Sequence, residues 1–326
     1  MTTTATILTR AIGTALLLAG LAPSTPVDAA SWPERTVRVI VTNPPGTGID
    51  VITRLFAERL SARWKQPVVV ENLVGADGIV AAREFVGKRD SHSLLYGFPG
   101  LITMNPLMHE KLPYDPARDL VPIASTTDNF VAIAASASLK VASLPDLVAL
   151  ARTRANKLNW AATPGTPFFA FAGLQKSAGV EMVHVPYRDF NQALVDLAEG
   201  RIDAVATGLA PLRSHVQAGK IKLLAFINRG RAPFAPEVPT VAEAGYADLT
   251  FDAVTGFFGG RDMPGELRER IAADIRAIAA EPAVKDRVAK LGSVVSTGTP
   301  ADFAAAIEKQ RAQVAAIHRT IAKPAQ

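Results

Sequence analysis

The sequence predicts an α/β protein made of two lobes. Three observations support this: short apolar runs alternate with amphipathic stretches, the alternation occurs twice (37–96 and 158–227), and two extended apolar runs at 131–135 and 252–258 flank the second set. Alternating strands and helices are typical of a parallel sheet covered on both faces. A length of 326 residues suits about two domains. We expect the flanking runs to cross between the lobes.

The first lobe begins with a predicted buried strand at Val37–Val41. The spacing of Ile52, Leu55, Phe56 and Leu60 then places four apolar side chains on one face of a helix. The same criteria predict strands at 67–70 and 94–96 and a helix at 79–86.

The second lobe repeats the pattern. Strands are expected at 158–161, 182–185, 204–206 and 222–227, with helices at 169–177, 192–198 and near 212–218. The Ala-rich stretches 266–280 and 301–322 are predicted to form helices that pack back on the first lobe.

The N-terminus has the pattern of a signal peptide. Arg10 precedes an apolar run over 11–22, prolines follow, and Val27-Asp28-Ala29 places small residues for cleavage near Ala29 or Ala30. The run is too short for a membrane-spanning helix, which takes about 20 apolar residues. We therefore expect residues 1–30 to be removed and a soluble mature protein to be exported, in a bacterium to the periplasm.

Composition excludes several classes of protein. The chain has no cysteine, so disulfides, thiolate nucleophiles and cysteine metal sites are ruled out. Hydrophobic residues make up 48% and charged residues 20%, which rules out a disordered chain. The net charge is +5, without a dense Lys/Arg run and interleaved aromatics. Nucleic acid is therefore a weak candidate partner, and acidic small molecules suit the charge equally well.

Turns after the first-lobe strands are candidate ligand sites. The first contains Pro45, Gly46, Thr47 and Asp50 at the start of a predicted helix, where free backbone N–H groups and the positive dipole end attract anions. The alternative is a plain turn with Thr47 or Asp50 as N-cap. The turn is neither a dinucleotide-binding fingerprint nor a phosphate-binding P-loop, because the required glycines and lysine are missing.

Two more turns follow the next strands. Residues 75–78 (Gly75, Ala76, Asp77, Gly78) form either a backbone anion site or a turn capped by Asp77. The third turn runs from Gly97 to Gly100 through Phe98 and Pro99. All three lie where open α/β sheets place their ligands.

The second lobe offers the loop 163–169. Pro164 and Pro167 stiffen it around Gly165, and Thr163 and Thr166 supply hydroxyl groups. Phe168 and Phe169 are adjacent, so either one lines a pocket or both pack beneath the loop. Downstream, Arg188 either clamps a carboxylate or is a solvated surface charge.

A catalytic constellation is missing from the sequence. The histidines lack metal-binding spacing and no nucleophile elbow occurs. Asp203, which precedes a predicted strand, is a turn cap or a general base. The five histidines are His92, His109, His184, His215 and His318.

A set of ordered motifs covers nearly the whole mature chain. They are PPG at 44–46 with Asp50 and Arg54, QPVVVEN at 66–72, GA at 75–76, NP at 105–106, KLPYDP at 111–116, KLNWA at 157–161, HVPY at 184–187, QAGK at 217–220 and VPTVAEAG at 238–245. In this order and spacing, the chain resembles the extracytoplasmic solute receptors of tripartite tricarboxylate transporters, the Bug receptors of bacteria.

The resemblance implies two Rossmann-like lobes with a ligand cleft between them, the type II periplasmic-binding-protein-like arrangement. Lobe one would comprise 31–131 and 254–326, and lobe two 132–253. The ligand would be a small carboxylate, with no cofactor, no metal and no catalytic residue. The residues carried over as ligand contacts are Pro45, Gly46, Thr47, Asp50, Gly75, Ala76, Phe98, Pro99, Gly100, Thr163, Pro164, Gly165, Thr166, Phe168, Phe169, Tyr187, Asp203 and Thr207.

The sequence also departs from the family pattern. Thr47 and Asp77 replace glycines, and the Ser/Gly-rich loop of lobe two carries Phe168 and Phe169 instead. These changes make the site more apolar and stiffer, which favours a mono- or dicarboxylate with an apolar or aromatic body. Expected partners are the permease subunits of such a transporter, with the receptor a monomer. The alternatives are a ligand-sensing receptor for a signalling partner and, less favoured, a periplasmic hydrolase or isomerase.

Overall fold

The structure, a computed structural model, describes residues 32–154 and 157–322. The elements below all belong to the compact unit that begins at Pro33. The predicted signal peptide lies outside the described residues. Within the described part of the chain, no helix is both long and apolar enough to cross a membrane.

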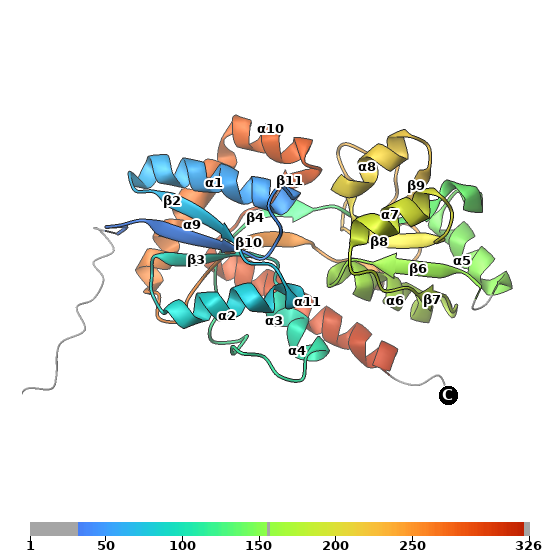
Figure 1. Cartoon of the computed structure of the whole chain (residues 1–326), viewed down its shortest axis with the longest axis horizontal. Coiled ribbons are helices and arrows are strands. Elements are labelled where there is room, and N and C mark those ends of the chain that lie inside the picture. Colours follow the sequence, from blue (N-terminus) through green and yellow to red (C-terminus); the bar gives the residue numbers. More distant parts are fainter. Residues whose placement is uncertain (1–31, 155–156, 323–326) are drawn as a thin grey trace, which may run out of the picture. The chain divides into compact units, whose positions relative to one another are not determined.

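The strands form two separate sheets (Figure 1). Sheet A has the order β11-β4-β10-β3-β1-β2, and sheet B the order β7-β6-β8-β5-β9. Sheet A contains β1 (Val37–Val41), β2 (Val68–Asn72), β3 (Ser93–Gly97), β4 (Val121–Asn129), β10 (Val254–Gly259) and β11 (Ser293–Val295). Sheet B contains β5 (Val131–Ser136), β6 (Asn159–Ala162), β7 (Val183–His184), β8 (Ala204–Gly208) and β9 (Ile221–Phe226).

Helices follow most of these strands. We call the elements around sheet A lobe one and those around sheet B lobe two. Lobe one has α1 (Gly48–Trp64), α2 (Ile79–Lys88), α3 (Gly100–Thr103), α4 (Asn105–Met108), α9 (Gly265–Ala280), α10 (Pro282–Lys290) and α11 (Pro300–Ala322). Lobe two has α5 (Leu144–Thr153), α6 (Thr166–Ala178), α7 (Phe190–Ala198) and α8 (Leu209–Gln217).

Both sheets are mixed, which corrects the expectation of purely parallel sheets. In sheet A, β1 pairs parallel with β2 and β3, but β10 runs antiparallel between β3 and β4. In sheet B, β6 pairs parallel with β7 and β8, but β5 runs antiparallel to β8 and β9. The antiparallel strands are those that carry the chain from one sheet to the other, so their direction follows from the crossing.

Helices cover both faces of sheet A. Two adjacent residues of β10 show this, since successive side chains of a strand point to opposite faces. The ring of Phe257 lies 6.2 Å from Phe56 of α1, on one face. The next residue, Phe258, lies 5.1 Å from Phe303 of α11, on the other face. Sheet B is arranged similarly, with α6 packed on one face and α7 and α8 on the other.

The strand β4 and the helix α10 were not predicted. The middle of β4 is Ser125-Thr126-Thr127, so it has no apolar pattern, yet these residues are buried. Their hydroxyls are satisfied internally: Tyr96 Oη lies 2.7 Å from Thr126 Oγ1, and Thr255 Oγ1 lies 2.7 Å from Thr127 Oγ1. A hydroxyl ladder thus replaces the apolar pattern expected of a central strand.

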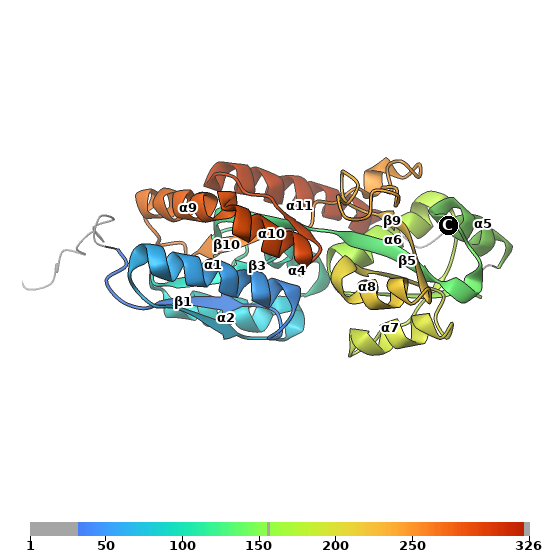
Figure 2. The ribbon, with the colours of Figure 1, turned by 90° about the horizontal axis from the view of Figure 1, so that it is seen from above.

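The C-terminal helix α11 packs on both lobes, which Figures 1 and 2 show from two directions. Phe303 and Ile307 in its first half belong to a core cluster of lobe one. Val314 and Ile317 in its second half belong to the cluster that contains α6. The expectation that this helix packs on lobe one is therefore correct only for its first half.

Two chain segments connect the sheets: β4 runs directly into β5 past Phe130, and residues 227–253 return to β10. The predicted crossing runs, 131–135 and 252–258, lie directly beside these connections. Side chains tie the connections together. Asn228 Nδ2 donates to Asp128 Oδ1 (3.1 Å) and to the Asn129 carbonyl (3.0 Å), and the Ala253 N–H donates to Asp128 Oδ1 (3.0 Å).

Candidate functional site

The first candidate turn is built around the buried carboxylate of Asp50. Asp50 is 2% exposed and accepts hydrogen bonds from the Gly46 N–H (2.8 Å), Arg54 Nε (3.0 Å) and Asn72 Nδ2 (2.8 Å). Burial alone would raise the pKa of Asp50, but these hydrogen bonds outweigh it and the pKa is lowered. Asp50 is therefore ionised and fully engaged in holding the turn, which leaves the turn's exposed rim, with Pro45 and Gly46, for a ligand.

Thr47 is the N-cap of α1, with its Oγ1 accepting from the Asp50 N–H at 3.4 Å. The capped-turn interpretation is confirmed for Thr47. It is compatible with an anion site, because the first N–H groups of a helix lack intrahelical acceptors.

The second turn has an unusual backbone. Gly75, Ala76, Asp77 and Gly78 have consecutive positive φ angles of 134°, 45°, 53° and 83°. Such angles are strained for Ala76 and Asp77. Asp77 does not cap α2, which corrects that alternative: the N-cap is Gly78, and Asp77 Oδ2 instead lies 3.0 Å from His109 Nε2.

The third turn leads into α3 and meets lobe two at a residue that the sequence analysis missed. Met104 is 3% exposed and belongs to the core cluster of lobe two, although it lies between α3 and α4 of lobe one. A Cβ added to Gly100 would lie 3.5 Å from Met104 Sδ, and one added to Gly165 would lie 3.4 Å from the same atom. Predicted loops of both lobes therefore meet at Met104.

In lobe two, the threonine hydroxyls gather at the carboxyl ends of β6 and β8. Thr163 Oγ1 donates to Thr207 Oγ1 at 3.3 Å, and the Thr163 N–H donates to the Ala206 carbonyl at 3.1 Å. Thr166 begins α6, directly after Gly165 with φ of 89°, and Pro164 is exposed beside it. These residues form one edge of lobe two.

The two phenylalanines have different environments. Phe169 is 1% exposed and packs in the core, 6.4 Å from the ring of His318. Phe168 is half-buried, and its ring lies 5.6 Å from Trp160 and 5.3 Å from His184. Of the pair, Phe168 is the ring with a surface available to a ligand.

Tyr187 and Asp203 are engaged elsewhere. Tyr187 Oη donates to Asp196 Oδ2 at 2.7 Å, and burial together with this bond raises the pKa of Tyr187 to about 12. Asp203 accepts from the Asn159 N–H at 2.8 Å, at the amino ends of β6 and β8. At about 3.3 Å per residue, β8 separates Asp203 from Thr207 by about 13 Å. This corrects the expectation that Asp203 joins the site.

The side chain of Arg188 is exposed, as the interpretation of this residue as a solvated surface charge requires.

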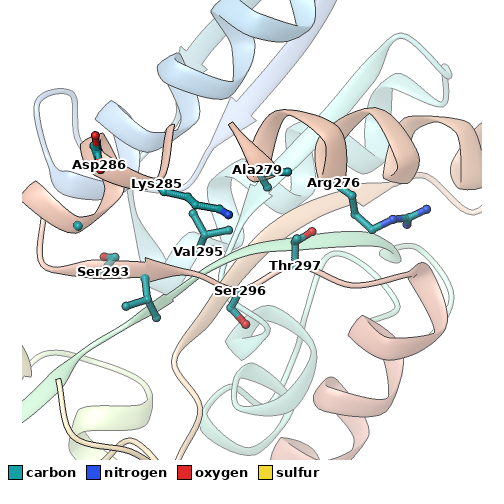
Figure 3. Close-up of a pocket in the computed structure, with 11 residues that line it drawn as sticks. Arg276, Ala279, Lys285, Asp286, Ser293, Val295, Ser296 and Thr297 are labelled. Atoms are coloured by element: carbon teal, nitrogen blue, oxygen red, sulfur yellow. The ribbon is translucent and has the colours of Figure 1, made fainter. Parts of the chain in front are cut away.

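A groove of 670 Å³ lies elsewhere on lobe one, between α9, α10 and β11 (Figure 3). None of the predicted ligand residues lines it. The candidate ligand site therefore consists of the loops described above, and the groove is a separate feature.

Comparison with known proteins decides the family. The model of the family described as "Tripartite tricarboxylate transporter family receptor" matches residues 52–322. The chain belongs to this family. The receptor is 31% identical to a UPF0065 protein of Bordetella bronchiseptica over 322 residues, covering 96% of this chain and 94% of the relative. The resemblance found in the sequence is thereby confirmed.

Solved structures of Rhodopseudomonas palustris proteins share the receptor's fold. One is titled "R. palustris Rpa4515 with adipate"; it has a TM-score of 0.80 and 28% identity, and the match covers 89% of this chain and 98% of that one. Another, MatC with bound malate, has a TM-score of 0.76 and 25% identity, with 88% and 100% covered. The receptor's fold is thus that of periplasmic solute-binding proteins, a class of binding proteins rather than enzymes.

Proposed function

We propose that this receptor captures a small carboxylate between its two lobes and delivers it to the membrane permease of a tripartite tricarboxylate transporter. The observation that carries the proposal is the meeting of loops from both lobes around the buried Met104, because a ligand held beside this junction touches both lobes at once. Closure on the ligand would complete the site, and neither catalysis nor a cofactor is required. We further propose that residues 1–30 direct export and that the mature receptor is a monomer.

The proposed contacts divide into polar and apolar groups. Backbone N–H groups after Gly46 and Gly75 and the hydroxyl of Thr166 would bind the carboxylate, since helix starts and hydroxyl donors favour anions. The Thr163 hydroxyl would join them by exchanging its hydrogen bond to Thr207 for one to the ligand. Phe168, the half-buried ring, would contact the carbon skeleton. The remaining rim positions of the proposed site are Pro45, Thr47, Ala76, Phe98, Pro99, Gly100, Pro164, Gly165 and Thr207.

The ligand class follows from this balance of contacts. Adipate, bound by a relative with 28% identity, has an aliphatic body between two carboxylates, as an apolar site flanked by N–H groups would require. We therefore propose an aliphatic or aromatic mono- or dicarboxylate, and we expect compact, hydroxylated polycarboxylates such as citrate to bind more weakly.

A thermal-shift screen tests the proposal. Adipate, malate, benzoate and citrate are compared with adipamide, the neutral analogue of adipate. A binding acid at a hundredfold excess over its Kd should stabilise the receptor by about 2.7 kcal/mol. Adipamide should give no shift where adipate does. Equal shifts from acid and amide, or no shift from any carboxylate, would refute a carboxylate receptor.

A further inference from the structure

The groove on lobe one runs along the free edge of sheet A. β11 is the last strand in the order of sheet A and pairs only with β4. Five consecutive residues, 293–297, line the groove (Figure 3). The first three of these residues form β11, and the next two follow it directly. Because successive side chains of a strand point to opposite faces, a groove that contacts all three strand residues reaches the backbone edge of β11.

The hydrogen-bond pattern shows which backbone groups face outward. The Ser296 N–H donates to the Thr126 carbonyl at 3.0 Å. Bonded and non-bonded positions alternate in an antiparallel ladder, so Val294 and Ser296 bond to β4 and Val295 directs its N–H and carbonyl away from it. Among the described residues, no backbone partner occupies this side of Val295.

The walls of the groove have small side chains on one side and carry positive charge. Ala279, Ala280 and Ala289 line the helical side with small side chains. Lys285 extends across the groove toward Val295 and forms no ion pair with any described residue, while Arg276 lies at the other end (Figure 3). The carboxylate of Asp286 points away from the strand in the same view.

We propose that this groove is a docking site for an extended, acidic segment of a partner polypeptide, which adds as a strand to the free edge of β11. An added strand gains main-chain hydrogen bonds from Val295, as in other cases of β-strand addition. Its acidic side chains meet Lys285 and Arg276, and the alanines accommodate its remaining side chains. Charge complementarity therefore selects an acidic segment over a basic one.

The docking strand lies beside a contact between the lobes. Val294 packs against a core cluster of lobe two. Arg213 of α8 donates from Nη1 to the Lys290 carbonyl at 3.0 Å, at the end of α10. A partner bound along β11 therefore contacts the part of lobe one that touches lobe two.

A binding assay with designed peptides tests the site. The probes are fluorescein-labelled hexapeptides that alternate valine with glutamate or valine with lysine, titrated into the full-length mature receptor. The glutamate peptide should bind at least about tenfold more tightly than the lysine peptide, and binding should weaken with added salt. Lys285→Glu should weaken the glutamate peptide at least about tenfold, whereas Arg118→Glu, an exposed charge reversal outside the groove, should not.

A second variant separates strand addition from simple charge attraction. Val295→Pro removes the outward N–H without removing a bond to β4, and edge strands tolerate proline at such positions. It should abolish peptide binding while the unfolding temperature and the response to adipate stay close to wild type. Equal affinity for both peptides, full binding by Val295→Pro or Lys285→Glu, or undetectable binding of the glutamate peptide would overturn the proposal. Displacement of the glutamate peptide by inorganic phosphate at equal concentration would instead indicate a small-anion site, and would overturn it as well.

Discussion

Met104 of lobe one and Gly165 of lobe two are neighbours across the two lobes: a Cβ on Gly165 would lie 3.4 Å from Met104 Sδ. Gly165 also has φ of 89° and ψ of −140°, a backbone region almost confined to glycine. The backbone conformation therefore disfavours a side chain at this position, although Met104 leaves room for a Cβ at ordinary contact distance.

Gly165→Ala should destabilise the receptor by about 1–3 kcal/mol through backbone strain. Gly179→Ala is the matched control, because Gly179 also has a positive φ (61°) but would meet nothing within 4 Å. Its cost should be only about 1 kcal/mol. Urea unfolding of both variants measures the difference, and an equal cost at the two positions would contradict the role given to Gly165.

Asn72→Ala should loosen the first turn. Asn72 Nδ2 donates both to Asp50 Oδ1 and to the Asn43 carbonyl (2.9 Å), so its loss leaves the buried carboxylate with fewer donors. We expect a cost of about 1–3 kcal/mol in the free energy of unfolding at neutral pH. Because the folded pKa of Asp50 is lowered, its contribution exists above the unfolded pKa and is lost as pH falls, so wild type and variant should converge in acid. A difference that grows on acidification would contradict this account.

The sequence predicts most of the elements because their apolar periodicity is intact. The helix at Gly48–Trp64 and the strand at Val37–Val41 are examples, and even the cap at Thr47 could be anticipated. β4 could not, because hydrogen bonds between threonines and Tyr96 replace apolar packing in its interior. Periodicity contains no information about such a ladder.

The candidate site was only partly predictable for a different reason. Loop residues at the carboxyl ends of strands follow from the general rule for α/β sheets. Asp203 fails that rule because it lies at the amino end of β8, as its position before the predicted strand already indicated, and only the family resemblance placed it in the site. Met104 lies in an apolar stretch that looks like an ordinary core position, and only the packing shows that it contacts the other lobe.

Phe168 and Phe169 should respond differently to truncation. Phe168→Ala removes a half-buried ring and should weaken binding of the best carboxylate by about 1 kcal/mol, or about fivefold, with a small effect on stability. Phe169→Ala empties a core position and should cost about 3–5 kcal/mol of stability. Isothermal titration and urea unfolding of both variants measure the two effects. Unchanged affinity in Phe168→Ala would remove this ring from the proposed site.

Asp128 should make the stability of the receptor depend on pH. Burial, together with the negative charge of Asp252, raises the pKa of Asp128 from 3.8 to about 6. The Ala253 N–H, Asn228 and the charge of Arg229 act in the opposite direction without cancelling the effect. Asp128 lies where the two connections between the sheets are tied together, so its ionisation acts directly on that junction.

The raised pKa of Asp128 determines whether the free energy of unfolding rises or falls with pH. Between pH 4 and pH 6 the folded state binds the proton of Asp128 and the unfolded state does not, so the free energy of unfolding falls as pH rises through this window. A shift of this size amounts to about 3 kcal/mol. Urea unfolding at pH 4, 5, 6 and 7 measures this effect. The free energy of unfolding of wild type minus that of Asp128→Asn should fall across this range, because the contributions of the other titrating groups cancel in the difference. Asp252→Asn, with one neighbouring charge removed, should move the midpoint of the fall to lower pH. A difference that stays constant from pH 4 to pH 7 would show that Asp128 titrates as an ordinary carboxyl group.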